Sequence, residues 1–201
     1  MHVKICGVTT VDDARGIVDR GASAIGLNFV PGSTRRIDVA RARAISRAVR
    51  GKVLVVGVVA DLTVAAMQAL VADAELECLQ LHGDEPADTL APLLPHAYKA
   101  IRIGGATDVD AARAYPGAYL LVDAKVEGAL GGTGASFDWS LVRDLARERK
   151  LTLAGGLRPD NVAEAVRQVR PWCVDVAGGV ESAPGVKDLA LVEAFVREAQ
   201  R

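Results

Sequence analysis

The sequence predicts an α/β fold, a single (β/α)8 TIM barrel over residues 1–201, and three observations support this. Eight short runs rich in Val, Ile and Leu alternate with eight Ala-rich helical patterns. The runs are continuously apolar, which indicates parallel strands covered on both faces of the sheet. A chain of 201 residues lies at the compact end for this barrel. The alternative is an open doubly wound sheet, which usually has only about five or six strands.

The expected strands share one pattern, since each is a short apolar run followed by a loop and then a helical segment. Their ranges are Val3–Cys6, Ala24–Asn28, Val53–Val59, Glu77–Leu81, Lys99–Ile103, Tyr119–Asp123, Leu151–Ala154 and Cys173–Val176.

The expected helices carry recognisable start signals. Thr10 can cap a helix whose first turn holds Asp12 and Asp13, where acids suit the positive end of the helix dipole. Pro86 is expected in the first turn of its helix, where a missing N–H does no harm. The remaining ranges are Asp38–Val49, Leu62–Ala72, Asp84–Leu93, Asp108–Ala114, Asp138–Arg147, Pro159–Val169 and Lys187–Ala199.

Composition narrows the function classes. The net charge is −1 with no Lys/Arg block, which argues against nucleic acid or a membrane surface as the main partner. No stretch is long enough to span a membrane, and no signal peptide is visible. The three cysteines, Cys6, Cys78 and Cys173, are odd in number and far apart, so we expect neither disulfides nor a metal site. These features suggest a cytoplasmic protein.

In a barrel of this type the active site lies at the C-terminal ends of the strands. That rule selects the polar or reactive residues at strand ends, together with two arginines in the second loop. They are Cys6, Asn28, Asp61, Gln80, His82, Arg102, Asp123, Asp175, Arg35 and Arg36.

Two glycine pairs follow the last two expected strands. Gly155 and Gly156 come after the seventh, and Gly178 and Gly179 after the eighth. Glycines let backbone N–H groups approach an anion closely, and barrels commonly bind phosphate in these two loops. Tight turns that need positive φ are the simpler explanation for one pair. Two pairs in these particular loops favour a phosphate site.

Strand parity bears on Cys6. Val3 and Ile5 suit the helix-covered outside, so Lys4 and Cys6 should point into the barrel. Closure of the barrel brings the first strand beside the eighth, which predicts Lys4 near Asp175. Asp123 could be a loop anchor or a catalytic acid. Burial would raise the pKa of Asp123 and a nearby cation would lower it, and the sequence leaves that balance open.

A set of short motifs at successive strand ends resembles the phosphoribosylanthranilate isomerase family of tryptophan biosynthesis along the whole chain. They are Lys4-Ile5-Cys6-Gly7, Gly26–Phe29, Ser33-Thr34-Arg35-Arg36-Ile37, Gln80-Leu81-His82-Gly83, Asp123, Gly131-Gly132-Thr133-Gly134, Phe137-Asp138-Trp139, Ala154–Leu157, Pro159, Asn161-Val162, Val174-Asp175-Val176 and Gly179-Val180-Glu181. The chain departs from the family at Gly178, which is often Ser, and at Gly32, where a bulkier residue is common.

The resemblance implies an enzyme that performs an Amadori rearrangement of a phosphosugar, an aldose–ketose isomerisation without cofactor or metal. It implies Cys6 as general base and Asp123 as general acid. Arg35 should meet the anthranilate carboxylate, and Asp175 should orient the substrate's amine or a ribose hydroxyl. The glycine loops should hold the phosphate, and a monomer or a homodimer is expected.

Several alternatives stay open at this point. Arg36 could replace Arg35 as the anthranilate partner, and His82 could either line the substrate pocket or bond within its loop. The segment 126–136 could be a lid or a surface loop. Competing functions are a phosphoribosylformimino-carboxamide isomerase, an indole-glycerol-phosphate synthase or a non-catalytic phosphosugar-binding barrel. The presence of both Cys6 and Asp123 argues against all three of these functions.

Overall fold

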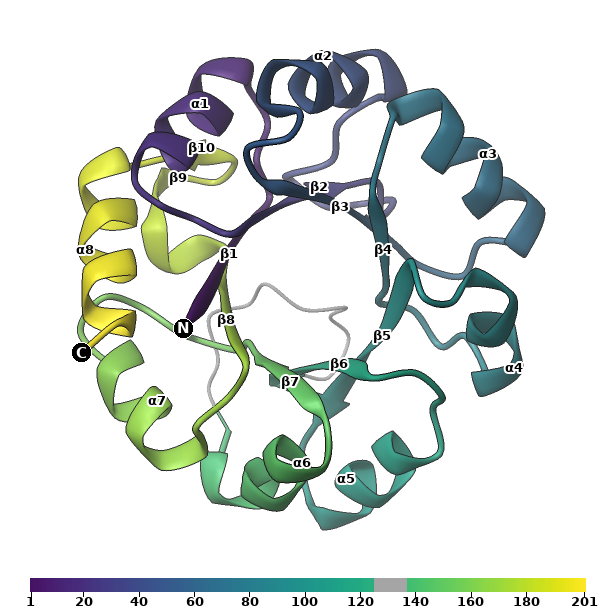
Figure 1. Ribbon diagram of the computed structural model, residues 1–201, viewed down its shortest axis with the longest axis vertical. Helices are drawn as coiled ribbons and strands as arrows, with labels where there is room; N and C mark the ends of the chain where they lie inside the picture. The colour runs from purple at the N-terminus through teal and green to yellow at the C-terminus, as the bar shows by residue number, and fades with distance from the viewer. Residues whose placement is uncertain (125–136) are drawn as a thin grey trace.

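Eight parallel strands close into a barrel in chain order, and the helices form a ring around it (Figure 1). This computed structural model describes residues 1–124 and 137–201. The barrel strands are β1 (His2–Cys6), β2 (Ala24–Asn28), β3 (Leu54–Val59), β4 (Cys78–Leu81), β5 (Ala97–Ile103), β6 (Tyr119–Ala124), β7 (Lys150–Leu153) and β8 (Cys173–Val176). The predicted fold class is confirmed, and the strand ranges agree within two residues.

The helices follow the strands as expected. They are α1 (Val11–Asp19), α2 (Val39–Val49), α3 (Val64–Ala74), α4 (Ala87–Leu90), α5 (Ala106–Arg113), α6 (Arg143–Glu148), α7 (Val162–Val169) and α8 (Leu189–Ala199), with the 3-10 turns η1 (Ala91–Leu93), η2 (Trp139–Val142) and η3 (Gly178–Val180). Thr10 caps α1 by accepting the Asp13 N–H at 3.0 Å. Pro86 precedes the first turn of α4 instead of lying within it.

One prediction about secondary structure was wrong in a way that matters for the site. Lys187 does not begin the last helix but lies in β10 (Val186–Lys187), which pairs with β9 (Glu181–Ala183) in a small antiparallel hairpin. Pro184 and Gly185 form the turn, and Gly185 takes a positive φ of 81°. The helix α8 starts only after Asp188, whose side chain caps it.

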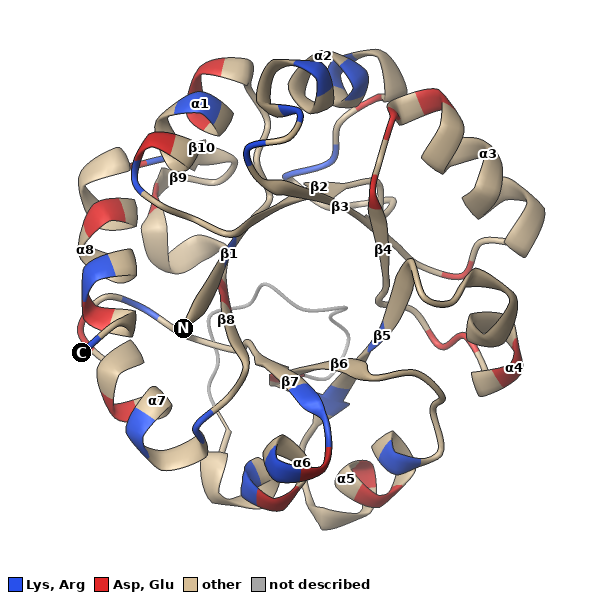
Figure 2. Cartoon of the chain, in the orientation of Figure 1, with Lys and Arg blue, Asp and Glu red and all other residues tan. Residues whose placement is uncertain are grey.

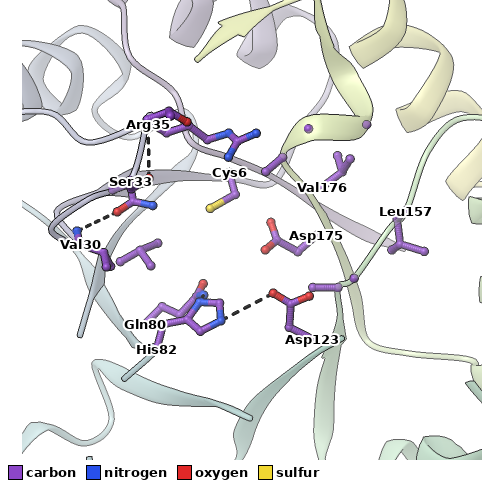
Figure 3. Close-up of a pocket in the computed structure, with 18 of the residues that line it drawn as sticks. Cys6, Val30, Ser33, Arg35, Gln80, His82, Asp123, Leu157, Asp175 and Val176 are labelled. Carbon is purple, nitrogen blue, oxygen red and sulfur yellow. Dashed lines mark hydrogen bonds and ion pairs between the residues drawn. The ribbon is translucent and has the colours of Figure 1, made fainter. Parts of the chain in front are cut away.

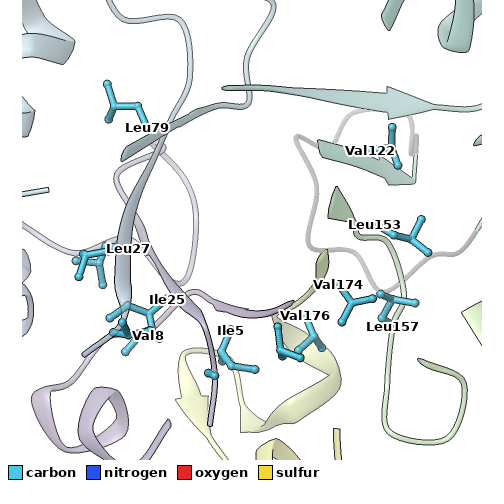
Figure 4. Packing of buried hydrophobic residues seen from close by; sticks show 14 of the residues in the cluster. Ile5, Val8, Ile25, Leu27, Leu79, Val122, Leu153, Leu157, Val174 and Val176 are labelled. Carbon is cyan, nitrogen blue, oxygen red and sulfur yellow. The ribbon is translucent and has the colours of Figure 1, made fainter. Parts of the chain in front are cut away.

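The main hydrophobic core lies between the strands and the surrounding helices. Figure 4 shows part of it, where Ile5, Ile25 and Val174 point away from the barrel axis. This is the parity that the sequence predicts for β1, because Ile5 faces the helices while Lys4 faces the barrel interior. Charged residues of both signs are spread around the outer ring of helices (Figure 2). No helix among the described residues is long and apolar enough to cross a membrane.

Candidate active site

A cavity of about 720 Å³ opens at the C-terminal ends of the strands, where the barrel architecture predicts it. It brings together most of the candidate residues (Figure 3). Those that line it are Cys6, Asn28, Arg35, Gln80, His82, Asp123, Gly155, Gly156, Asp175, Gly178 and Gly179.

Three candidates are placed elsewhere. Asp61 binds the neighbouring loop, where its carboxylate accepts the N–H of Asp84 at 2.7 Å. Arg102 forms an ion pair with Asp84, and Arg36 is exposed. None of these three is among the described residues that line the cavity. The segment 126–136, considered above as a lid or a surface loop, lies outside the described residues.

Lys4 and Asp175 form a buried ion pair inside the barrel. They are opposite each other in the β1–β8 register, and the Lys4 ammonium donates to both carboxylate oxygens at 3.1 Å. The proximity predicted from strand parity is therefore confirmed. Burial disfavours the ammonium, but the Asp175 carboxylate outweighs it and holds the pKa of Lys4 well above its usual value. Lys4 is thus a permanent cation.

Cys6 lies next to this pair, and a glycine makes room for it. Gly26 faces Cys6 across the β1–β2 register. A Cβ on Gly26 would lie 2.7 Å from the Cys6 Sγ and 3.1 Å from the Lys4 Nζ. The Cys6 thiol and the Lys4 ammonium therefore both occupy space that a side chain at Gly26 would fill. Burial raises the pKa of the Cys6 thiol, and the nearby Lys4 charge opposes that rise.

Asp123 at the end of β6 is a carboxylate kept from water. Burial is the largest influence and raises its pKa to about 6, although the Ala124 N–H, which it accepts at 2.8 Å, and two cations work the other way. The balance that the sequence left open is thus decided by burial. A carboxyl group with this pKa is partly protonated near neutral pH and can serve as an acid.

His82 faces Asp123 as a neutral imidazole. Burial, together with surrounding cations, lowers the pKa of His82 to about 3. Its Nε2 lies 3.6 Å from the Asp123 Oδ2, longer than a hydrogen bond (Figure 3). His82 therefore lines the cavity and also hydrogen-bonds locally to Gln80, so the structure shows features of both alternatives.

A chain of hydrogen bonds sets the tautomer of His82. The Tyr98 hydroxyl donates to Gln80 Oε1 at 3.1 Å, which leaves the Gln80 amide NH2 to face His82 Nδ1 at 2.9 Å. Nδ1 is then the acceptor, so the ring proton is on Nε2. That N–H points toward Asp123. At 3.6 Å from Oδ2, Nε2 makes no hydrogen bond to the Asp123 carboxylate in this structure.

Arg35 reaches from the loop after β2 to the loop after β8. Its Nε and Nη2 donate to the two oxygens of Glu181 at 2.8 and 2.7 Å. Arg35 therefore lies at the cavity and is held by a bidentate ion pair, whereas Arg36 points to solvent.

The two glycine loops form one wall of the cavity. Gly155 and Gly156 have φ values of 90° and 64°, which favour glycine. A Cβ on Gly155 would lie 2.7 Å from the Ala124 backbone nitrogen, so this loop passes directly behind Asp123. Gly178 and Gly179 begin a 3-10 turn on the neighbouring side. Both loops present backbone to the opening.

Sequence reasoning missed three residues that organise the site. Tyr98 lies just before the expected strand Lys99–Ile103 but belongs to β5, and only its alternation with Ala100 signals an inward position. Glu181 ends the motif Gly179-Val180-Glu181, but no local pattern indicates its contact with Arg35. Lys187 was assigned to a helix, although the preceding Pro184-Gly185 pair is a turn signal.

The comparisons with known proteins agree with this geometry. The family model described as N-(5'phosphoribosyl)anthranilate (PRA) isomerase matches residues 3–198. An N-(5'-phosphoribosyl)anthranilate isomerase from Pseudomonas aeruginosa (strain LESB58) is 47% identical over 199 residues, covering 98% of this chain and 93% of its own length. The protein of that name from Myxococcus xanthus is 45% identical over 205 residues, covering 100% and 96%.

Solved structures extend the similarity to three dimensions. The crystal structure of phosphoribosyl anthranilate isomerase from Thermotoga maritima matches with a TM-score of 0.91 at 35% identity, covering 100% of this chain and 98% of the other. A structure of the isomerase in complex with reduced 1-(o-carboxyphenylamino)-1-deoxyribulose 5-phosphate matches at 0.88 and 34%, with the same coverage. Fold, sequence and strand-end residues therefore agree, and the chain belongs to the N-(5'-phosphoribosyl)anthranilate isomerase family.

Proposed function

We propose that this chain converts N-(5'-phosphoribosyl)anthranilate to 1-(2-carboxyphenylamino)-1-deoxyribulose 5-phosphate with Asp123 as general acid and Cys6 as general base. As a member of the family, it is an isomerase of tryptophan biosynthesis. The observation that supports the two roles best is that Cys6 from β1 and Asp123 from β6 line the same cavity. Such an arrangement lets an acid and a base reach different atoms of one small substrate.

The reaction requires two proton transfers, and each candidate suits one of them. Asp123 gives its proton to the furanose oxygen, the ring opens, and a Schiff base forms. Cys6 then removes the proton from C2′, and the resulting enolamine tautomerises to the ketone. The raised pKa of Asp123 supports the acid role, and the Lys4 ammonium beside Cys6 supports a thiolate there.

The remaining residues bind the substrate in this proposal. Arg35 receives the anthranilate carboxylate, and the backbone N–H groups around Gly155–Gly156 and Gly178–Gly179 receive the phosphate. Asp175 orients the substrate's amine or a ribose hydroxyl, and His82 lines the same pocket. We further propose a cytoplasmic location and either a monomer or a homodimer, which sedimentation of the purified protein would distinguish.

A fluorescence assay tests the function directly. Purified protein is mixed with N-(5'-phosphoribosyl)anthranilate, whose anthranilate fluorescence reports consumption, beside a Cys6→Ala variant. We expect turnover by the intact protein and loss of most turnover in the variant, with substrate binding retained. A folded intact protein that leaves the substrate unchanged would overturn the assignment.

A further inference from the structure

The ion pair between Arg35 and Glu181 is largely buried. The side chains are only 15% and 5% exposed, and the two residues lie 146 positions apart. Two parallel N–H···O bonds fix the plane of a guanidinium as well as its position. Glu181 occupies the edge formed by Nε and Nη2. The Nη1 atom has no hydrogen bond to any described residue.

Two glycines let Arg35 lie in this place. Gly7, directly after Cys6, has a φ of 74°, and a Cβ there would overlap the Arg35 Cδ. A Cβ on Gly178 would lie 3.3 Å from the Arg35 Nη2. The side chain thus crosses bare backbone of the loops after β1 and β8, and Figure 3 shows it reaching past Cys6 at the rim of the cavity.

Glu181 is itself held from the other side by Lys187. The ammonium donates to Glu181 Oε1 at 2.7 Å and to the Ala177 carbonyl at 3.0 Å, and the Lys187 side chain is fully buried. Ala177 immediately precedes the glycine pair of the eighth loop. The hairpin β9–β10 sets this contact, because Lys187 pairs with Glu181 in its register. One carboxylate therefore joins Arg35 to the loop proposed to receive phosphate.

The cluster holds more basic groups than acidic ones. Arg35 and Lys187 are two basic groups around one carboxylate, and Arg35 is the one that lines the cavity. Burial lowers the pKa of Lys187, and its hydrogen bond to Glu181 works against that effect. Burial raises the pKa of Glu181, but its hydrogen bonds to Arg35 and Lys187 outweigh that effect and the net pKa is lowered, so the carboxylate stays ionised. A partly buried excess charge is costly unless a ligand balances it. The cluster therefore suits a substrate that carries its own negative charge.

We propose that Glu181 is a positioning residue that orients Arg35 so that its Nη1 side receives the anthranilate carboxylate. It acts through Arg35 and does not itself touch the substrate. Lys187 keeps Glu181 in place and links this orientation to the eighth loop. The inference rests on the proposed function, since it assigns a role in recognising the carboxylate of that same substrate.

The test compares two substrates in two variants. N-(5'-phosphoribosyl)aniline has the phosphosugar but lacks the carboxylate, so the ratio of kcat/KM for the two substrates measures carboxylate recognition. Glu181→Gln should lower this ratio by about 10- to 100-fold, mostly through KM for the natural substrate, because a buried ion pair loses one partner. Arg35→Met should lower it at least as far. Glu193→Gln, an exposed carboxylate on α8, is the matched control and should leave the ratio unchanged.

The outcomes separate the role from mere stabilisation. If Glu181→Gln reduces kcat/KM for both substrates in parallel, Glu181 is only structural and the inference fails. Glu181→Asp, which keeps the charge, should restore part of the ratio. Should the variants be inactive, the ¹⁵Nε–H signal of Arg35 decides: slow exchange with water in the intact protein and fast exchange in Glu181→Gln support the role. Equal exchange would contradict it. An intact protein that turns over neither substrate would refute the proposed function instead.

Discussion

At the scale of single residues, the site holds its two proposed proton carriers in unfavourable protonation states. Burial raises the pKa of Asp123 to about 6 and also raises that of Cys6. At neutral pH most molecules therefore carry an ionised Asp123 and a protonated Cys6. The proposed chemistry needs the reverse, a protonated Asp123 and a thiolate. Only a minority of molecules therefore has the protonation states that catalysis needs. Between the pKa of Asp123 and that of Cys6 this fraction does not change with pH, because protonated Asp123 decreases as fast as the Cys6 thiolate increases.

The need for a protonated Asp123 and a Cys6 thiolate, the reverse of the prevailing protonation states, predicts the pH profile of kcat/KM. Below about pH 6 the profile should fall, since Asp123 is already protonated and the thiolate keeps decreasing. Above the pKa of Cys6 it should fall again as protonated Asp123 disappears. The acidic limb thus reports the pKa of Asp123, even though Asp123 is the proposed general acid, whose titration would ordinarily set the basic limb.

The substrate phosphate also titrates near pH 6, so the acidic limb of the kcat/KM profile could report either group. A variant distinguishes them. The Arg102 charge lowers the pKa of Asp123, so Arg102→Met should raise that pKa and move the acidic limb to higher pH. The pKa of the substrate phosphate would stay the same. A limb at the same pH in both proteins would show that Asp123 does not control it.

A second prediction concerns the thiol. Replacing Lys4 by Met removes the cation beside Cys6, so the pKa of Cys6 should rise and alkylation by iodoacetamide at pH 8 should slow by about tenfold. Cys78 and Cys173 contribute little at that pH because burial raises their pKa to about 11 and about 12. Mass spectrometry of the labelled peptides measures each thiol separately. An unchanged rate at Cys6 would show that Lys4 does not support its thiolate.

At the scale of secondary-structure elements, the strands could be predicted closely from the sequence because apolar runs are a local signal. Parity along β1, together with closure of the barrel between β1 and β8, predicts Lys4 beside Asp175, and the register confirms it. The hairpin β9–β10 could not be found this way, since its strands are short and largely polar. The Arg35–Glu181 ion pair joins distant parts of the chain, and no local sequence pattern predicts it. The pKa of Asp123 depends on the balance of burial and charge, which only the packed structure determines.

The pairing of β1 with β2 gives a prediction of its own. Gly26→Ala would place a methyl group 2.7 Å from the Cys6 Sγ, so the thiol must shift. We expect kcat to fall by about 10- to 100-fold, the size of effect that a small misplacement of a reacting group produces. Gly105→Ala is the control, because an added Cβ there meets nothing within 4 Å. Equal kcat in both variants, with thermal melts confirming folding, would contradict the placement of Cys6.

At the scale of the whole molecule, the buried Asp123 carboxylate, the acid of the proposed mechanism, lowers the stability of the fold. In the folded protein the pKa of Asp123 is about 6, above the usual 3.8 of an unfolded chain. The folded state therefore binds the proton more tightly between these values, and the contribution of Asp123 to stability declines as pH rises through that window. Above pH 6 the folded protein carries the full cost of a buried charge.

Asp123→Asn should remove that cost. We expect the free energy of unfolding at pH 8 to increase by roughly 2–3 kcal/mol relative to the intact protein, and the gain to shrink toward pH 4. Urea denaturation at both pH values measures it, with exposed Asp144→Asn as the control. A gain that is the same at both pH values would mean that the ionisation of Asp123 is not its source.

The central claim is that Cys6 and Asp123 carry out the two proton transfers. The most direct measurement is kcat of Cys6→Ala and of Asp123→Asn in the fluorescence assay, with binding of the reduced product analogue as a check on the site. The account predicts that each variant loses about 10²- to 10⁴-fold in kcat while the analogue still binds. A kcat within a few-fold of the intact protein in either variant would contradict the role assigned to that residue.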